Sequence, residues 1–149
     1  MIAEAQKRNP AANIIYKVCD IEEYEYPENS YDLVISNLVL HYVADLDSIF
    51  KKVYQTLKTG GTFLFNIEHP VFTAGINEDW LYAEDGTPTA WPIDNYFYPG
   101  ERQTAFLGLH VIKQHHTLTQ ILMGVANAGF VLEHIEEANP PKKCCSFPE

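Results

Sequence analysis

The sequence predicts an α/β fold with a Rossmann-like, mostly parallel sheet and flanking helices, and three observations within residues 31–69 support this class. One apolar run rich in β-forming residues spans Asp32–Ser36, and a second spans Thr62–Ile67. Between them, apolar residues recur at the spacings of three and four that are typical of one helical face; they are Leu46, Ile49, Phe50, Val53, Tyr54 and Leu57. A strand, a helix and a second buried strand form a βαβ unit, which is almost always parallel and right-handed.

Turn and cap residues set the expected boundaries of this unit. Asp45 precedes the helical pattern, and its carboxylate can accept hydrogen bonds from the free N–H groups of the first helical turn. Gly60 and Gly61 follow the pattern and are expected to stop the helix. In open α/β sheets, ligands bind beyond the carboxyl ends of the strands. The unit therefore points to two candidate site segments, residues 36–42 and 66–70.

Further elements are predicted on both sides of the unit. They are a helix over residues 1–8, a strand over residues 14–19 that ends at Asp20, a helix over residues 117–128 closed by Gly129, and a strand over residues 130–135. Between the unit and the later helix, residues 70–112 show no clear periodicity. Such a long connection usually indicates a lid or a binding insertion.

This insertion is rich in aromatic side chains. Aromatic walls line small-molecule pockets, which favours a substrate lid that includes Trp80 and Tyr96, although a satellite core is the alternative. The aromatic residues are Phe72, Trp80, Tyr82, Trp91, Tyr96, Phe97 and Tyr98.

Composition limits the classes of partner. A length of 149 residues predicts a single domain, and a net charge of −10 argues against nucleic acid and against anionic membrane surfaces. No apolar run reaches transmembrane length, and the first residues lack the hydrophobic segment of a signal peptide. Three cysteines without framework spacing indicate a reduced, cytoplasmic compartment.

Polar residues at the predicted strand ends are the candidates for chemistry, and each has a structural alternative. The carboxylate of Asp20 could accept from an adenine amino group or ribose hydroxyls, or it could cap a turn. His41 could face the ligand cleft, where a near-neutral pKa suits proton transfer, or bond to the backbone at a helix start. Tyr42 could contact substrate or belong to the core. Glu68 and His69 could form a general acid/base pair, although strand alternation would put them on opposite faces.

Two pairs of adjacent residues, His115-His116 and Cys144-Cys145, lack the spacing of a zinc site, so no metal is predicted. Asn139-Pro140-Pro141 superficially matches a motif of amino-methylating enzymes. It follows the last predicted strand and precedes Lys142 instead of an aromatic residue, so we interpret it as turn residues.

The runs DLVISNLVLHY (residues 32–42) and LKTGGT (57–62) resemble class I S-adenosylmethionine-dependent methyltransferases, in particular their small-molecule, methyltransferase type 11-like branch. The strand end at Cys19-Asp20-Ile21 is similar to the adenine-contacting position of that family. The run NIEHPVFTAG (66–75), followed by the aromatic insertion, also resembles a bacterial subgroup. The resemblance covers residues 1 to about 137.

This resemblance implies S-adenosylmethionine as the cofactor and assigns roles to individual residues. Asp20 and Ile21 would hold the adenine ring, and Asn37 with Leu38 would lie beside the methionine part. His41 would face the substrate as the candidate catalytic residue. The remaining candidates are the substrate-binding Tyr42, His69, Trp80 and Tyr96. In the family, catalysis is largely the positioning of a nucleophile in line with the methyl group.

The chain departs from the family pattern at both ends. Family members begin with a strand, a glycine-rich GxGxG loop and a second strand, and none of the eight glycines here forms that loop. We therefore expect a partial domain that lacks the first two strands and the last strand of the family fold. In the family's strand order only its fourth and fifth strands would remain neighbours here, with unpaired edges elsewhere.

Two functions from different classes remain open at this point. One is a methyltransferase, or part of one, that acts on a small molecule. The alternative is a non-catalytic remnant that serves as an interaction or oligomerisation module, with a homo-oligomer expected if the chain folds alone. A dinucleotide oxidoreductase shares the architecture, but no glycine fingerprint supports it and the adenine-position resemblance favours the methyltransferase.

Overall fold

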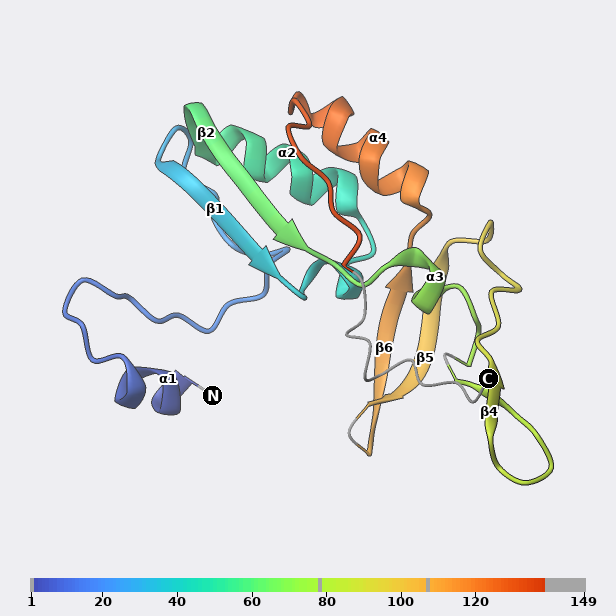
Figure 1. The fold of residues 1–149 in the computed structure, drawn as a ribbon. Helices are drawn as coiled ribbons and strands as arrows, with labels where there is room; N and C mark the ends of the chain where they lie inside the picture. The colour runs from blue at the N-terminus through green and yellow to red at the C-terminus, as the bar shows by residue number, and fades with distance from the viewer. Residues whose placement is uncertain (1, 78, 107, 139–149) are drawn as a thin grey trace.

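A computed structural model of the chain describes residues 2–77, 79–106 and 108–138, and its elements follow one another as shown in Figure 1. They are α1 (Ile2–Arg8), β1 (Tyr31–Asn37), the short 3₁₀ helix η1 (Leu40–Tyr42), α2 (Leu46–Thr56), β2 (Leu57–Asn66), α3 (Pro70–Thr73), β3 (Leu81–Tyr82), β4 (Pro88–Ala90), β5 (Gly100–Phe106), β6 (Leu109–His115) and α4 (Leu118–Ala128).

The predicted βαβ unit is confirmed. β1 and β2 pair in parallel, with a register that runs from Leu33 opposite Thr62 to Asn37 opposite Asn66. α2 connects them, and the Asp45 carboxylate caps this helix by accepting from the Ser48 N–H at 3.0 Å. Because the carboxyl ends of both strands lie at one edge, the two predicted site segments are brought together there.

The expectation that Gly60 and Gly61 stop the helix was wrong. α2 ends at Thr56, and both glycines lie inside β2, where the register with β1 shifts. Gly60 has a φ of +79°, which favours glycine. A Cβ on Gly61 would lie 2.9 Å from the Lys58 carbonyl oxygen, so the backbone turn needs glycine there too.

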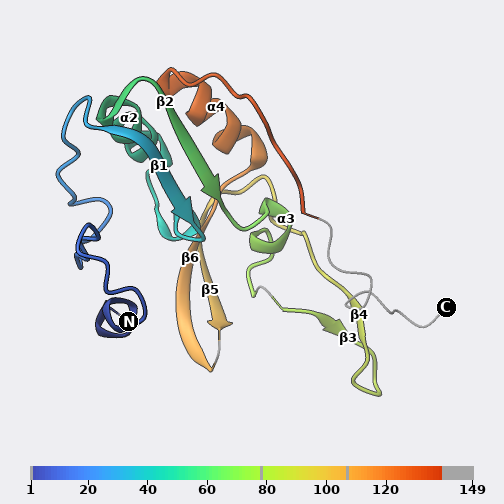
Figure 2. The same cartoon turned by 60° about the vertical axis from the view of Figure 1, so that its left-hand side comes forward.

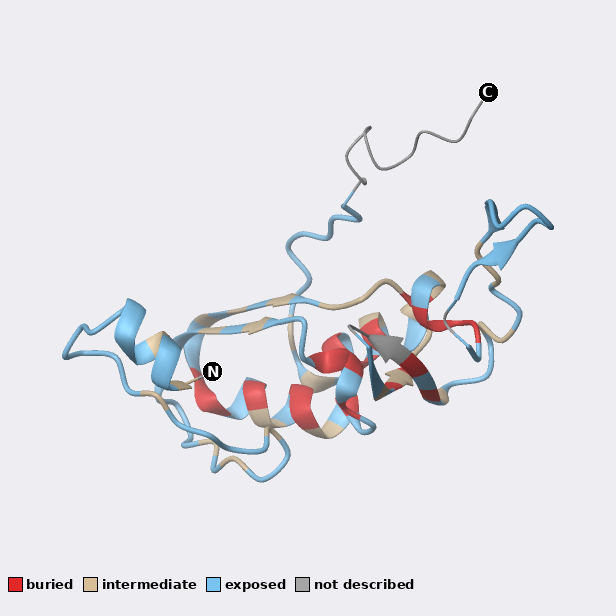
Figure 3. Cartoon of the chain, turned by 90° about the horizontal axis from the view of Figure 1, so that it is seen from below, coloured by how far each residue is buried: buried red, intermediate tan, exposed pale blue. Residues whose placement is uncertain are grey.

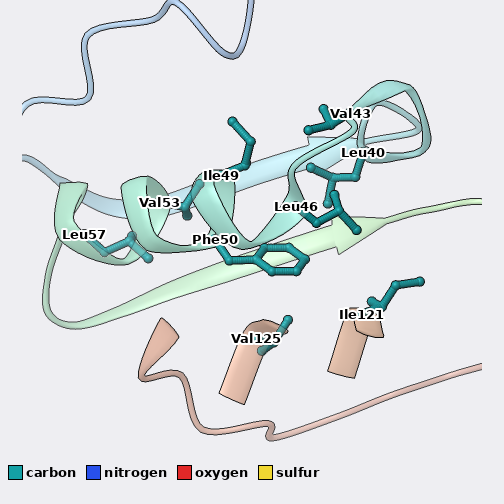
Figure 4. Close-up of a cluster of buried hydrophobic side chains, with 9 residues drawn as sticks. All are labelled: Leu40, Val43, Leu46, Ile49, Phe50, Val53, Leu57, Ile121 and Val125. Atoms are coloured by element: carbon teal, nitrogen blue, oxygen red, sulfur yellow. The ribbon is translucent and has the colours of Figure 1, made fainter. Parts of the chain in front are cut away.

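The hydrophobic core lies between one face of the β1–β2 pair and the helices α2 and α4 (Figures 3 and 4). α4 is confirmed as predicted, with a capping box at Thr117 and a left-handed C-cap at Gly129. Gly124 lets α4 approach α2, because a Cβ there would lie 3.0 Å from the Phe50 ring. The buried cluster comprises Leu40, Val43, Leu46, Ile49, Phe50, Val53, Leu57, Ile121 and Val125.

The insertion has more structure than its sequence predicts. β5 and β6 form an antiparallel hairpin, and a smaller antiparallel pair, β3–β4, precedes it. The parallel sheet was predicted correctly for β1–β2, whereas these two antiparallel pairs were not predicted. β6 contacts η1 and α3, so the hairpin lies against the carboxyl ends of β1 and β2 (Figure 2).

Two predicted strands are absent, and this corrects the sequence analysis. Residues 14–19 and 130–135 have the apolar composition of strands but adopt irregular conformations, because no described strand lies beside either segment to pair with it. The predicted α1 is confirmed, although none of its residues is buried. No helix in the described ranges has the length and apolarity needed to cross a membrane.

Candidate functional site

The ends of β1 and β2 form a polar corner. Asn37 and Asn66 are register partners, and the Asn66 Nδ2 donates to the Asn37 Oδ1 at 3.4 Å. The Leu38 N–H then donates to the Asn66 carbonyl oxygen at 2.9 Å, which continues the pairing one residue beyond β1. Both candidate segments therefore contribute backbone and side-chain polar groups to one place.

The backbone at this corner is strained. Leu38 has a φ of +54°, in the left-handed region that a side chain with a Cβ rarely adopts. One residue before the end of β1, the Ser36 hydroxyl is buried and has no hydrogen-bond partner among the described residues. Strain and unsatisfied polar groups of this kind cluster at ligand sites.

His41 lies in η1, immediately beyond this corner, and only 3% of its surface is exposed. Its Nδ1 accepts from the Glu68 N–H at 3.4 Å, so the neutral ring carries its proton on Nε2. Burial lowers the pKa of His41, the Glu68 carboxylate raises it, and the Lys113 ammonium lowers it further. The neighbouring Tyr42 is 43% exposed, with its ring centroid 4.3 Å from that of His41.

Glu68 pairs with a residue that the sequence analysis missed. The Lys113 Nζ lies 2.8 Å from both carboxylate oxygens of Glu68, and the lysine is buried. Glu68 and His69, which the sequence left open as an acid/base pair, bond to Lys113 and Glu137 respectively. Val111, Lys113 and His115 are two residues apart along β6, which places them on one face of that strand. This spacing could be recognised in the sequence only if β5 and β6 were already known to pair.

His69 caps α3 and has hydrogen bonds at both ring nitrogens. Its Nδ1 accepts from the Val71 N–H at 3.2 Å, and its Nε2 lies 2.5 Å from the Glu137 carboxylate. Figure 1 shows that the segment after α4 returns past the β2 end toward α3, which brings Glu137 to this point.

Trp80 and Tyr96 lie in the insertion. The Trp80 ring packs edge-on against Trp91, with centroids 5.4 Å apart, and Trp91 packs likewise against Phe72. Tyr96 is tied to the hairpin and α4: its hydroxyl accepts from the Leu118 N–H, and its carbonyl oxygen accepts from His115 Nε2. The insertion therefore contains an aromatic cluster that is joined to the folded core.

Buried polar contacts dock the hairpin. His115, which is fully buried, lies 2.7 Å from the Thr73 hydroxyl through Nδ1, and burial lowers its pKa. The Arg102 guanidinium is buried and donates to backbone carbonyl oxygens, including those of Ala74 and Tyr98. These contacts hold β5 and β6 beside the ends of β1 and β2.

Asp20 and Ile21 follow the irregular segment that was predicted to be a strand. Asp20 is exposed, and its Oδ1 accepts from the Glu22 N–H at 2.8 Å, which is the turn-capping geometry. Ile21 packs against the core cluster, and Lys52 of α2 donates to the Glu22 carbonyl oxygen at 2.8 Å. These contacts fix the backbone of this segment on α2 and leave the Asp20 side chain on the surface.

No group of three potential metal ligands occurs within the described residues. His116 Nε2 lies 2.8 Å from the Val43 carbonyl oxygen, so His115 and His116 both bind protein groups. Cys144, Cys145 and the Asn139-Pro140-Pro141 motif lie outside the described residues.

With this geometry in hand, the comparisons with known proteins identify the family. A family profile described as Methyltransferase domain matches residues 1–65. A solved structure described as an S-adenosylmethionine-dependent methyltransferase from Listeria monocytogenes is 37% identical, with a TM-score of 0.90 over 99% of this chain and 67% of that one. The chain belongs to the S-adenosylmethionine-dependent methyltransferases.

Other members of the family agree with this assignment. An S-adenosylmethionine-dependent methyltransferase structure from Mesorhizobium loti is 38% identical, with a TM-score of 0.83 over 97% of this chain and 65% of that one. A malonyl-[acyl-carrier protein] O-methyltransferase from Acetivibrio thermocellus is 31% identical over 103 residues, which are 68% of this chain and 34% of that protein. The chain spans at most 45% of the first curated relatives that it matches.

S-adenosylmethionine is therefore the cofactor of this methyltransferase family, and the strand-end residues suit it. The unpartnered Ser36 hydroxyl and the polar Asn37 offer hydrogen-bonding groups at the end of β1, and the exposed Asp20 carboxylate offers an acceptor. The comparisons support the predicted methyl transfer and do not favour the alternative of a non-catalytic interaction module.

Proposed function

We propose that this chain takes part in S-adenosylmethionine-dependent methyl transfer to a small-molecule acceptor. The observation that carries the proposal is the strained polar corner at the carboxyl ends of β1 and β2, with Asn37, Leu38 and His41 within it. Ligands of open α/β sheets bind at such a corner.

The cofactor side of the site would use four residues. The Asp20 carboxylate would accept from the adenine amino group while Ile21 packs beside the ring, and Asn37 and Leu38 would lie along the methionine part. Support comes from the exposure of the Asp20 side chain and from the anchoring of the following backbone on α2 by Lys52. A carboxylate held on a fixed backbone costs little ordering on binding.

The acceptor side would use His41 and four aromatic or imidazole side chains. Tyr42 borders His41, His69 caps α3 beside the β2 end, and Trp80 and Tyr96 belong to the aromatic insertion. Pockets lined by aromatic groups with a few polar groups suit small organic molecules. We accordingly treat residues 70–112 as the acceptor-binding wall of a single domain.

Methyl transfer would require little of these residues beyond positioning the acceptor. The cofactor supplies an electrophilic methyl group, and the chain's residues would hold the acceptor nucleophile in line with it. His41, neutral and with its proton on Nε2, can donate a hydrogen bond that orients an acceptor oxygen. A proton lost from the acceptor can pass to water.

The proposal includes further strands around β1 and β2. One face of this parallel pair is open, and residues 14–19 and 130–135 have no strand beside them among the described residues. Further family strands would pair with the strand edges, and family helices would cover the open face. If the chain folds alone, a second copy would do so. Light scattering of the purified chain separates a monomer from an oligomer. Cysteine usage supports a reduced, cytoplasmic compartment.

Calorimetric titration with S-adenosylmethionine tests the cofactor assignment. We expect binding to the chain, weakened about tenfold or more in Asp20→Ala because a hydrogen bond to a charged group is lost. Glu23→Ala, which removes an exposed carboxylate three residues away, is the matched control and should bind normally. Absence of binding, both to this chain and to a version extended at its N-terminus by a glycine-rich loop region, would contradict the proposal.

Transfer of a labelled methyl group tests the acceptor class. After incubation with labelled S-adenosylmethionine and a cell extract, acid precipitation separates macromolecules from small molecules. We expect label in the soluble fraction. Label confined to precipitated nucleic acid or protein would overturn the small-molecule part of the proposal while keeping methyl transfer.

A further inference from the structure

Three aromatic rings of the insertion, those of Phe72, Trp80 and Trp91, pack against one another and are called the ring cluster below. The Trp91 ring contacts both of the others, with centroid distances of 5.6 Å to Phe72 and 5.4 Å to Trp80 and interplanar angles of 65° and 80°. An edge-to-face contact of this kind covers one face of one ring, so other ring faces stay available. Phe72 and Trp80 are 53% and 36% exposed, which agrees with this arrangement.

The ring cluster is fixed to the backbone beside the end of β2. The Trp91 indole N–H donates to the Val71 carbonyl oxygen at 3.2 Å, and the Phe72 N–H donates to the His69 carbonyl oxygen at 2.8 Å. Phe72 and Val71 belong to α3, which begins shortly after β2 ends (Figure 1). The rings therefore lie next to the corner where we propose that methyl transfer takes place.

The electrostatic surroundings of the ring cluster are acidic. Every charged residue within residues 70–99 is an aspartate or a glutamate, and this range contains no Lys, Arg or His. The Asp79 carboxylate accepts from the Trp80 N–H at 2.7 Å and from the Tyr82 hydroxyl at 3.2 Å. Among the described residues, no cation pairs with this carboxylate. A negative charge is therefore held beside the rings without a compensating positive charge.

Ring faces and carboxylates attract the same kind of ligand. Ammonium groups, quaternary ones above all, bind over the faces of Trp, Tyr and Phe. An acidic surface also raises the local concentration of cations and repels anions. We propose that the ring cluster binds a cationic ammonium group of the methyl acceptor, an inference that rests on the proposed methyl transfer.

Acceptors of other charge fit these observations less well. The carboxylates of residues 70–99 would repel an anionic acceptor. A neutral organic group would gain from contact with the exposed rings, as any apolar group would, but it would gain nothing from the Asp79 carboxylate. The charge of the bound group is therefore the property that a test has to measure.

Tryptophan fluorescence reports binding at the ring cluster, because Trp80 and Trp91 are the two tryptophans of the chain. The probes, compared at constant ionic strength, are choline, the anion dimethylbutyrate and the neutral isostere dimethylbutanol, in which a tert-butyl group replaces the trimethylammonium group. We expect choline to change the emission saturably, the alcohol to bind about fivefold more weakly and the anion to have no effect. An emission that does not respond to choline, or equal affinities for choline and the alcohol, would overturn the inference.

Two variants remove the two attractions separately. Trp80→Leu removes one ring but keeps Trp91 as the reporter, and choline affinity should fall about fivefold while the affinity for dimethylbutanol changes less. Asp79→Asn keeps an acceptor oxygen for the Trp80 N–H but removes the charge, so it should weaken the binding of choline alone. Tyr31→Leu, which removes a 38% exposed aromatic ring at the start of β1, is the matched control.

Unchanged choline affinity in both variants would overturn the inference. If either variant fails to fold, the comparison of the three probes on the unaltered chain still decides it.

Calorimetry with S-adenosylmethionine separates this inference from the proposed function. We expect saturating choline to leave cofactor binding unchanged, because cofactor and acceptor would occupy different parts of the corner. Competition between them would overturn the inference, since the rings would then bind the sulfonium of the cofactor. Choline binding without any cofactor binding or methyl transfer would overturn the proposed function and leave the ring cluster as an ammonium site. A labelled methyl product that passes through a cation exchanger would overturn the ammonium acceptor and keep methyl transfer.

Discussion

The two faces of the β1–β2 pair differ sharply although the strands are apolar on both. On one face, Val34, Phe63 and Phe65 pack against the core beneath α2 and α4. On the other, Leu33, Ile35 and Leu64 are 51%, 62% and 59% exposed. Strands of parallel sheets usually have both faces covered by helices, which is why they read as continuous apolar runs. The difference teaches that both strands have the apolar composition of strands covered on both faces, whereas the described residues cover only one face.

Phe50→Ala should produce the largest effect, since Phe50 is fully buried between α2 and the covered face. Removing a buried aromatic side chain costs about 4 kcal/mol in the free energy of unfolding. Urea denaturation of the chain measures it, with Leu64→Ala on the open face as the control. Equal losses for the two variants would mean that the open face is also packed in solution.

Gly124→Ala probes how closely α4 approaches the covered face. An added Cβ would lie 2.7 Å from an Asp47 carboxylate oxygen and 3.0 Å from the Phe50 ring. Overpacking outweighs the gain in helix propensity, and we expect a net loss of about 1–2 kcal/mol. Asn127→Ala, at an exposed position of α4, is the control. A stabilised Gly124→Ala chain would show that α4 is packed less tightly than the structure has it.

Thr117→Ala removes the capping box that begins α4, the helix that closes the covered face. The loss of an N-cap side chain costs about 1 kcal/mol. Denaturation followed by circular dichroism checks this value. Thr119→Ala, at an exposed position in the first turn of α4, should leave the denaturation midpoint nearly unchanged. If Thr119→Ala lost as much stability as Thr117→Ala, the missing cap would not explain the loss.

Ile35→Ser on the open face should change the free energy of unfolding least, by less than about 0.5 kcal/mol, because the side chain is already exposed to water. The same variant should reduce self-association, which light scattering measures. A large loss of stability at a concentration where the chain is monomeric would contradict the openness of this face.

The sequence predicted the covered side of the molecule well because local signals determine it. The helical spacing from Leu46 to Val53, the Asp45 cap and the stop at Gly129 act within a few residues. The strands at residues 14–19 and 130–135 were predicted from composition, but a strand also needs a neighbour, which composition does not provide.

The β5–β6 hairpin was harder to predict because its buried residues are polar. Arg102, Lys113 and His115 are buried in the hairpin, where a sequence pattern would place them on a solvent face. Their partners are Ala74, Glu68 and Thr73, all more than 25 residues away in the chain, so no local pattern reveals the pairing. His41 and Glu68 were among the candidates at the strand ends, whereas Lys113, which pairs with Glu68, was not.

Leu38 combines a left-handed backbone with a side chain that is 48% exposed, so the leucine brings little burial to offset its conformation. Glycine would adopt the same backbone without the steric cost of about 1–2 kcal/mol. A chain selected only for folding would gain by that exchange. Under the proposed role of Leu38 beside the cofactor, Leu38→Gly should give a more stable protein that binds S-adenosylmethionine less tightly, which urea denaturation and calorimetric titration measure.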